Sequence, residues 1–287
     1  MTWEETIKSI REKPGFETIV KDSYYESDLK RNIESFGKSK EFKETVSLIK
    51  KYLPGAKTIL DIGAGNGISS VNFALTGFAV SAVEPDASDT VGANAIRQLQ
   101  SLYNLNNLFV YESIAEELSF DTNSFDVVYI RQAMHHAHDL EKFVYECARV
   151  LKPGGILLTV RDHVIFDQTD KELFLESHPL HKFYCGENAF TAKEYKTAMK
   201  NAGLKVVKEI KYYDSVINYF PSTYESIKQL ERDMEIKLKT SLKNKLGSLS
   251  QLPFIYYLYK LKNHFAGSVL NEKLVPGRMY SYIAKKV

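Results

Sequence analysis

Residues 58–67 of this chain read Thr-Ile-Leu-Asp-Ile-Gly-Ala-Gly-Asn-Gly, and this stretch decides the fold. The apolar run 59–62 is typical of a buried parallel strand, and the residues from Ile68 onward form a plausible helix. Three glycines at alternate positions separate the two, which lets the backbone turn tightly and lets a ligand approach it. The stretch therefore predicts the first strand, turn and helix of a nucleotide-binding α/β sheet.

The spacing of these glycines, together with one acid, indicates the charge of the ligand. A dinucleotide site has the order G-x-G-x-x-G, with a pyrophosphate at the helix N-terminus. Here Gly63, Gly65 and Gly67 follow the order G-x-G-x-G, and Asp61 lies inside the end of the strand. A carboxylate at that place would repel a phosphate and attract a cation. The sequence thus favours a positively charged ligand over a dinucleotide.

From Thr58 onward, short apolar runs alternate with helical patterns, which is typical of a doubly wound α/β sheet. Asp139 can cap one of the helices, and Thr191 and Glu194 form a capping box for another. We predict a Rossmann-like α/β fold with seven strands, the last of them antiparallel. The expected strands are Thr58–Ile62, Ala79–Val83, Leu108–Tyr111, 125–130, 155–160, 204–216 and 278–284.

The same pattern divides the chain into three units. Residues 1–56 are expected to form an N-terminal helical cap, with breaks at Pro14-Gly15 and at Gly37. The α/β core comprises 57–216 and 278–287, and 217–277 is a helical insertion that we interpret as a lid. A shorter insertion covers 164–190. Both insertions should lie above the carboxyl ends of the strands, where open α/β sheets bind ligands.

Composition restricts the possible partners and location. The net charge of +2 gives no overall attraction to nucleic acid, and we expect no nucleic-acid partner. The two cysteines imply no disulfide framework, which fits a reducing cytoplasm. The polar, acidic start lacks the pattern of a signal peptide, and no apolar stretch approaches the ~20 residues needed to span a bilayer. The oligomeric state is not indicated.

A second acid lies at the end of the second expected strand. Glu84 follows Asp61 by 23 positions. In a nucleotide-binding sheet an acid at this point is placed to accept hydrogen bonds from both ribose hydroxyls. The alternative, an acid in a solvated loop, is disfavoured by the preceding strand and by the glycine-rich turn upstream.

Four segments together resemble the class I S-adenosylmethionine-dependent methyltransferases, in particular the small-molecule branch of methyltransferase type 11. They are 58–67, Val83-Glu84-Pro85, 115–126 (AEELSFDTNSFD) and 148–155 (ARVLKPGG). Their order and spacing agree over about residues 45–160. The resemblance implies S-adenosylmethionine as the cofactor and is weakly informative about the methyl acceptor.

The resemblance also implies roles for individual residues. Asp61 and the glycine backbone would hold the methionine moiety, Glu84 would hold the ribose, and the backbone of Arg131 would lie near the methionine end. Many relatives have an Asp for the adenine amino group where this chain has Ile114, and Ser113 or Glu116 could replace it. The expected cofactor residues are Asp61, Gly63, Ala64, Gly65, Asn66, Gly67, Glu84, Pro85, Ser113, Ile114, Ala115, Glu116, Arg131, Gln132 and His136.

Histidines are concentrated after the fourth strand, where they should line the mouth of the pocket. A histidine pair recurs here in the resembled branch, and His136 is our first candidate for a general base, followed by His135 and His163. The alternative is that the paired rings only pack and form hydrogen bonds around the cofactor. His135 and His138 are spaced i, i+3, but no cysteine or carboxylate spacing completes a zinc site, so we expect no metal.

Polar and aromatic residues of the 164–190 insertion are candidates for contacts with the methyl acceptor, together with the end of the fifth strand. Alternatively, these side chains hold a lid through their own hydrogen bonds. Tyr24 and Tyr25 could cover the cofactor or pack in the core. The acceptor candidates are Tyr25, Arg161, His163, His181, Tyr184 and Glu187.

We therefore predict a methyltransferase (EC 2.1.1) that acts on a small-molecule or lipid-like acceptor at oxygen, nitrogen or carbon. One alternative is a non-catalytic module that binds S-adenosylmethionine or S-adenosylhomocysteine. Another is an aminopropyl-type transferase, which Asp61 disfavours because that donor has partly lost the amino-acid end that the carboxylate would hold.

One segment points to a further partner. Residues 236–271 contain six lysines and no acids around the apolar and aromatic run 252–259. Such a segment can lie on an anionic membrane surface. The alternative is a lid helix with a solvated lysine face.

Overall fold

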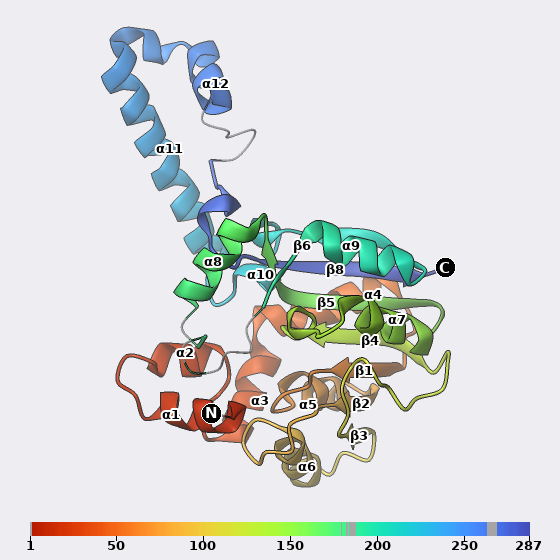
Figure 1. Ribbon diagram of the computed structural model, residues 1–287. Coiled ribbons are helices and arrows are strands. Elements are labelled where there is room, and N and C mark those ends of the chain that lie inside the picture. The colour runs from red at the N-terminus through yellow and green to blue at the C-terminus, as the bar shows by residue number, and fades with distance from the viewer. Residues whose placement is uncertain (1, 179, 182, 184–187, 263–268) are drawn as a thin grey trace.

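The computed structural model describes residues 2–178, 180, 181, 183, 188–262 and 269–287, which form a central sheet covered by helices (Figure 1). Seven strands follow the order β3-β2-β1-β4-β5-β8-β7, and β8 alone among them runs antiparallel to its neighbours β5 and β7. The predicted fold class, including the antiparallel last strand, is confirmed. The strands are β1 (Thr58–Ile62), β2 (Ala79–Val83), β3 (Leu108–Tyr111), β4 (Phe125–Arg131), β5 (Leu151–Ile165), β7 (Leu204–Ile210) and β8 (Met279–Lys286), and β6 (Phe190–Thr191) pairs with the end of β5.

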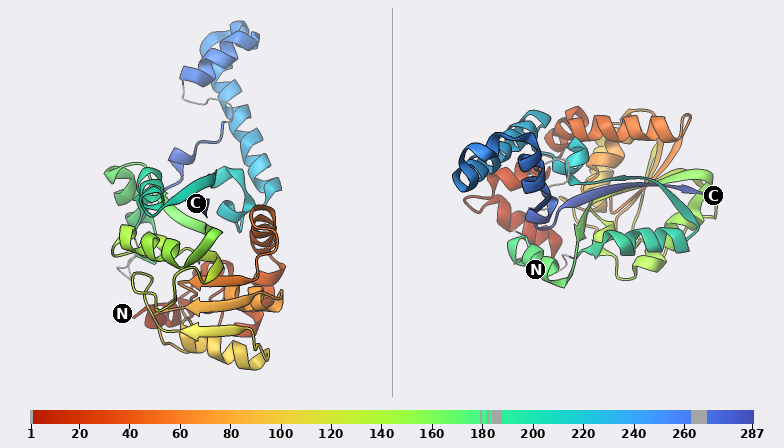
Figure 2. Two further views of the ribbon diagram at one scale, coloured as in Figure 1. Left: turned by 90° about the vertical axis from the view of Figure 1, so that its right-hand side faces the viewer. Right: turned by 90° about the horizontal axis from the view of Figure 1, so that it is seen from above.

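Side chains alternate between the two faces of the sheet, and both faces are buried. Ile59 packs into the core on one face and Leu60 into the core on the other. Because helices cover both faces (Figure 2), the central strands β1, β2 and β4 are largely buried, whereas β7 includes exposed residues. One face carries α3 (Leu29–Lys38), α4 (Lys40–Tyr52), α5 (Ile68–Leu75), α6 (Ala93–Leu102) and α10 (Val216–Tyr219), and the other carries α7 (Leu140–Val150) and α9 (Ala192–Asn201).

The N-terminal helices α1 (Trp3–Arg11) and α2 (Glu17–Asp22) lie against the carboxyl edge of the sheet. Ile7 and Ile10 pack with Val91, which follows β2, and with Leu180 of the shorter insertion. The Thr90 hydroxyl donates a hydrogen bond of 3.0 Å to Glu4 of α1. The chain segment preceding the sheet therefore covers the loops that follow its first two strands.

One of the two predicted helix breaks is correct. The break at Pro14-Gly15 lies between α1 and α2 as expected. The break at Gly37 is wrong, because Gly37 lies inside α3, where an added Cβ would come within 2.2 Å of the Asn72 side chain. The chain instead changes direction at Ser39, whose hydroxyl accepts a hydrogen bond from the Phe42 N–H and caps α4.

Two strand predictions need correction. β5 is longer than the expected 155–160 and continues to Ile165, with an irregular register between Thr159 and Asp162, so the first insertion starts within a strand. The expected strand 204–216 ends at Ile210. Beyond it, the Asp214 carboxylate accepts a hydrogen bond from the Lys211 N–H and forms a 3-10 turn.

The long insertion contains a helical hairpin that projects from the body of the protein (Figures 1 and 2). Its arms are α11 (Tyr224–Leu246) and α12 (Pro253–Lys262), and the shorter insertion contains α8 (Gln168–Ser177). Within the described residues, no helix is long and apolar enough to cross a membrane. The division into a cap, a core and a lid stays a prediction.

Candidate cofactor and active site

The loop after β1 is held against β2 by its own backbone. The N–H groups of Gly63 and Ala64 both donate to the carbonyl of Val83, at 2.9 and 3.1 Å. Gly63 has a φ of 67°, and a Cβ added there would lie 2.4 Å from the Cβ of Ala133. Only glycine fits this position, because both the backbone conformation and the close approach exclude a side chain.

Asp61 lies at the carboxyl end of β1 and is 1% exposed. The Ser70 hydroxyl donates a hydrogen bond to its carboxylate from the first turns of α5. Burial raises the pKa of Asp61 to about 7; the hydrogen bond from Ser70 opposes this shift and the nearby charge of Glu84 adds to it. A desolvated carboxylate of this kind favours a ligand that brings positive charge.

Glu84 lies at the end of the neighbouring strand β2 and is 8% exposed. One of its carboxylate oxygens accepts from the N–H of Gly65 at 2.7 Å and the other from the N–H of Asp86 at 3.0 Å. Burial raises the pKa of Glu84 to about 7 despite these two hydrogen bonds. Neither Glu84 nor Asp61 forms an ion pair with any residue that the structure describes.

The rest of the loop links the core to the N-terminal helices. The side-chain amide of Asn66 donates a hydrogen bond of 2.7 Å to the carbonyl of Tyr24. Gly67 has a φ of 83° and is the N-cap residue of α5. Ala64 is buried, and Pro85 after Glu84 is exposed.

The residues expected beside the adenine follow β3. Ile114 is exposed and Ala115 is buried. The Ser113 hydroxyl donates to the carbonyl of Glu117 at 2.8 Å. Glu116 is buried, and its Oε1 accepts from the N–H groups that begin the next turn, at His138 and Asp139. One oxygen of the proposed substitute acceptor Glu116 is therefore already used by the protein.

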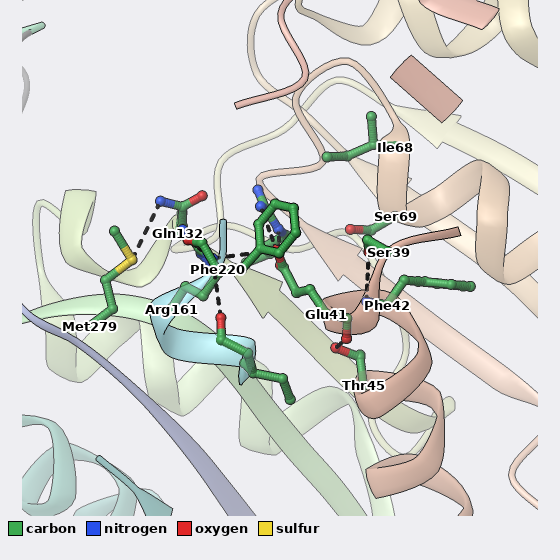
Figure 3. A network of polar contacts seen from close by, with 12 residues as sticks. Ser39, Glu41, Phe42, Thr45, Ile68, Ser69, Gln132, Arg161, Phe220 and Met279 are labelled. Carbon is green, nitrogen blue, oxygen red and sulfur yellow. Dashed lines mark hydrogen bonds and ion pairs between the residues drawn. The ribbon is translucent and has the colours of Figure 1, made fainter. Parts of the chain in front are cut away.

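A buried charge network lies beside the ends of β4 and β5 (Figure 3). Glu41 of α4 is fully buried and forms a two-point ion pair with Arg131, with N–O distances of 2.6 and 3.2 Å. Arg161, expected to contact the acceptor, places its guanidinium 3.5 Å from Glu41 and donates to the carbonyls of Ile217 and Phe220. The network ties α4 to both strands and to the start of the long insertion.

Two residues of this edge have unusual backbone geometry. Gln132, which follows β4, and Arg161, which lies at the register irregularity within β5, have positive φ angles of 51° and 61°. The N–H of Gln132 donates to the carbonyl of Val160 at 2.9 Å. Non-glycine residues in this region are uncommon and cluster at functional sites, so this edge is a natural place for ligand contacts.

His135, His136 and His163 form a cluster. The carboxylate of Asp162 accepts from the backbone N–H of His135 at 3.2 Å and lies 3.1 Å from Nδ1 of the same residue. The rings of His135 and His136 are 4.0 Å apart, and those of His135 and His163 are 4.8 Å apart. His135 and His163 are buried, whereas His136 is exposed. A chain of polar groups thus runs from a buried carboxylate to a ring at the surface.

The other acceptor candidates are spread more widely. Nδ1 of His163 donates to the carbonyl of Gly277 at 2.6 Å, at the end of the long insertion. Tyr25 packs edge-on against Trp3 of α1, at 5.6 Å between ring centroids. The backbone N–H of His181 donates to the carbonyl of His178. Tyr184 and Glu187 lie outside the described residues.

Sequence reasoning assigned no role to two residues that shape this site. Ser70 partners Asp61, and its signal is a hydroxyl residue in the first turn of the helix that follows the glycine-rich loop. Asp162 orients His135, and its signal is an acid at the end of a buried strand beside two other polar residues. Both act through a neighbour, and such contacts are visible only in three dimensions.

The chain is similar to known methyltransferases. Residues 60–159 match the methyltransferase domain family of type 11. Over 112 residues the chain is 33% identical to the uncharacterized methyltransferase YcgJ of Bacillus subtilis, covering 37% of this chain and 40% of that protein. Over 132 residues it is 33% identical to the ubiquinone/menaquinone biosynthesis C-methyltransferase UbiE of Blochmanniella floridana, covering 46% and 52%. The chain thus spans about half or less of the length of these relatives.

Among solved structures, the chain is similar to geranyl diphosphate C-methyltransferase from Streptomyces coelicolor A3(2), in complex with Mg2+, geranyl-S-thiolodiphosphate and S-adenosyl-L-homocysteine. The match has a TM-score of 0.56 at 15% identity and covers 85% of this chain and 76% of that one. At this identity the likeness shows a shared fold.

Proposed function

We propose that this chain, whose residues 60–159 match the methyltransferase domain family of type 11, uses S-adenosylmethionine to methylate a small-molecule or lipid-like acceptor at oxygen, nitrogen or carbon. The observation that carries the proposal is the pair of buried carboxylates, Asp61 and Glu84, at the ends of neighbouring strands. No cation of the described chain pairs with either.

These residues fit S-adenosylmethionine in their chemistry. The pKa values of both acids are raised to about 7, so a ligand that stabilises the ionised forms gains binding energy from them. A nucleoside with ribose hydroxyls and a cationic amino-acid end supplies both hydrogen-bond donors and positive charge. Glu84 would accept from the ribose and Asp61 would attract the cationic end, with the glycine backbone between them.

The bound cofactor supplies an activated methyl group, so the protein mainly aligns the acceptor and excludes water. Alignment of this kind can be worth up to about 7–11 kcal/mol. The N-terminal helices cover the carboxyl edge through Ile7, Ile10 and Tyr24, which helps to exclude water. His136 is the candidate that would take a proton from the acceptor, because it is exposed at this edge and its ring lies against His135.

His135 would then act through His136 rather than on the acceptor. Asp162 holds its Nδ1, which fixes the tautomer and the orientation of the ring. His163, which is buried and donates to the Gly277 carbonyl, would position the end of the long insertion. Arg161, Tyr25 and His181 remain proposed acceptor contacts.

The acceptor class rests on the relatives. One relative, 33% identical over 132 residues, is named for ubiquinone and menaquinone biosynthesis. This name points to lipophilic, prenylated small molecules, and we propose an acceptor of that kind for this chain. A cytoplasmic location, suggested by the two cysteines, is part of the proposal.

The test is a transfer assay with methyl-labelled S-adenosylmethionine and an organic extract of a bacterial lysate. The full chain should move label into an extractable small molecule and form S-adenosylhomocysteine, and Glu84→Ala should reduce both. Label that stays in the cofactor with every extract, alongside tight cofactor binding, would instead support the non-catalytic module.

A further inference from the structure

We propose that the tip of the α11–α12 hairpin binds to the surface of an anionic lipid bilayer. The hairpin projects from the body of the protein (Figures 1 and 2), so its tip can reach a surface without moving the sheet. The proposal concerns where the protein is located and does not depend on the methyltransferase activity.

The first observation is that α12 turns its apolar face outward. Phe254, Tyr257, Leu258 and Leu261 follow the spacing i, i+3, i+4, i+7, which places them on one side of the helix. All four are exposed, and Phe254 is 69% exposed. An amphipathic helix in a globular protein normally buries this face, so the exposed side of α12 is available to an apolar partner.

The opposite side of α12 is occupied by α11. The hydroxyls of Tyr259 and Ser241 are 3.1 Å apart, and the ammonium of Lys239 lies over the ring of Tyr256 at 5.4 Å. These contacts place Tyr256 and Tyr259 on the side of α12 that faces α11. The apolar face lies on the other side of the helix and therefore points away from α11.

The apolar surface continues through the turn between the two helices. Leu246, Leu249 and Leu252 are each exposed by more than two fifths. Together with the exposed face of α12 they form what we call the tip patch: Leu246, Leu249, Leu252, Phe254, Tyr257, Leu258 and Leu261.

The acids of α11 lie near the body of the protein, and lysines predominate toward the tip of the hairpin, as binding to an anionic surface requires. Glu225, Glu231, Asp233 and Glu235 all lie in the part of the helix near the body, and no acid occurs in 236–262. The distal part of the hairpin carries Lys237, Lys239, Lys243, Lys245 and Lys260. The ammonium groups of Lys239, Lys245 and Lys260 lie over the rings of Tyr256 and Tyr259. We therefore assign the contact with lipid phosphates to Lys237 and Lys243, while the apolar side chains of the tip patch enter the acyl boundary.

The length and composition of the hairpin helices favour binding at the bilayer interface over insertion into the bilayer interior. Neither helix of the hairpin is long and apolar enough to span a membrane, and this holds for the whole described part of the chain. The hairpin would therefore lie on the surface with the tip patch buried at the headgroup level. In this position the protein could take up a lipophilic acceptor from the membrane.

The test is flotation of the full chain with vesicles of phosphatidylcholine mixed with phosphatidylglycerol and with vesicles of phosphatidylcholine alone. The protein should float with the anionic vesicles, and much less with the neutral ones or at high salt. Phe254→Glu with Leu258→Glu should abolish flotation. Lys237→Gln with Lys243→Gln should lower the partition coefficient about 25-fold, since each lysine near the surface contributes about fivefold.

The matched control is Leu173→Glu with Leu230→Glu, which adds the same two charges at exposed leucines of α8 and of the part of α11 near the body. This control should float like the unaltered chain, and circular dichroism should confirm that all variants are folded. Absence of binding to the anionic vesicles, or equal flotation of the tip-patch variant, would overturn the proposal. So would a dimer that depends on the tip patch and forms in the absence of vesicle binding, because the patch would then be covered by a second copy.

Discussion

The N–H of Gly65 donates a hydrogen bond of 2.7 Å to Oε2 of Glu84, which joins the loop after β1 to the acid after β2. The bond holds the carboxylate in place before any ligand arrives. Asp86 fixes the other oxygen, so the carboxylate has little freedom to lose on binding. The neighbouring Asp61 is equally fixed by Ser70. The two acids therefore form a rigid, desolvated edge, and several measurable consequences depend on it.

Cofactor affinity should rise with pH. In the free protein the pKa values of Asp61 and Glu84 are both about 7, well above their ordinary values, and the cationic cofactor favours the ionised carboxylates. Between about pH 6 and about pH 8 the affinity for S-adenosylmethionine should increase roughly tenfold for one acid and up to ~100-fold for both. Calorimetry at a series of pH values checks this. An affinity that is flat or falls over this interval would contradict the assignment of the acids.

Asp61 should reduce stability at neutral and alkaline pH. Its pKa is raised from 3.8 to about 7 by burial, so the unfolded chain loses this proton first and stability falls as pH rises between those values. Asp61→Asn removes that loss. The gain in the free energy of unfolding, from urea titrations, should be larger at about pH 8 than at about pH 5.

Asp126 provides the matched control, because its pKa is lowered in the folded protein whereas that of Asp61 is raised. Although burial opposes the shift, Lys152 and the N–H groups of Lys57 and Thr58 lower the pKa of Asp126 to about 2. Its carboxylate therefore stabilises the fold above pH 3.8, and the stabilisation is lost as pH falls toward 2. Asp126→Asn should destabilise the protein at both of the pH values used for Asp61→Asn. A gain for Asp61→Asn that does not change with pH would show that Asp61 is not desolvated as described.

His136→Ala should separate turnover from cofactor binding. If His136 takes a proton from the acceptor, its loss should lower kcat about 10²–10⁴-fold. The affinity for S-adenosylhomocysteine should change little, because Asp61, Glu84 and the glycine backbone hold the cofactor in the proposed site. His138→Ala is the control, since His138 is also exposed and lies two residues away. Equal losses of kcat and of cofactor affinity in His136→Ala would instead make His136 part of the cofactor site.

Glu41→Ala should destabilise the fold strongly. The variant leaves Arg131 and Arg161 buried without their counter-charge, and breaking a buried pair in this way costs about 3–5 kcal/mol. Lys40→Ala removes a neighbouring but exposed pair with Glu225 and should change the free energy of unfolding by less than about 1 kcal/mol. Urea denaturation of both variants measures the difference. Similar small effects would mean that the buried network does not hold α4 to the sheet.

The sequence predicted the structure best for the first three strands of the sheet and for the residues at their ends. The first three strands have the bounds predicted for them, because each is a short apolar run between turns. Asp61 and Glu84 could be placed together because parallel neighbouring strands end at the same edge.

The sequence was least informative where distant residues meet. Glu41 lies 90 positions from Arg131 and 120 from Arg161, and no periodic pattern links them. Gly37 was assigned to a break because glycine disfavours helices, yet close packing against Asn72 requires it inside one. The outward face of α12 also required the structure, because an apolar stripe alone does not show whether it is covered.

The most direct test of the central claim is a calorimetric titration of S-adenosylhomocysteine into the full chain, Glu84→Ala and Glu117→Ala. Glu117 is an exposed acid in the segment that follows β3 and serves as the matched control. The unaltered chain and Glu117→Ala should bind one equivalent with the same affinity. Glu84→Ala should bind roughly 10–150-fold more weakly, because it loses charge-assisted hydrogen bonds to the ribose. Equal affinity of all three proteins, or no binding by the unaltered chain, would contradict the account.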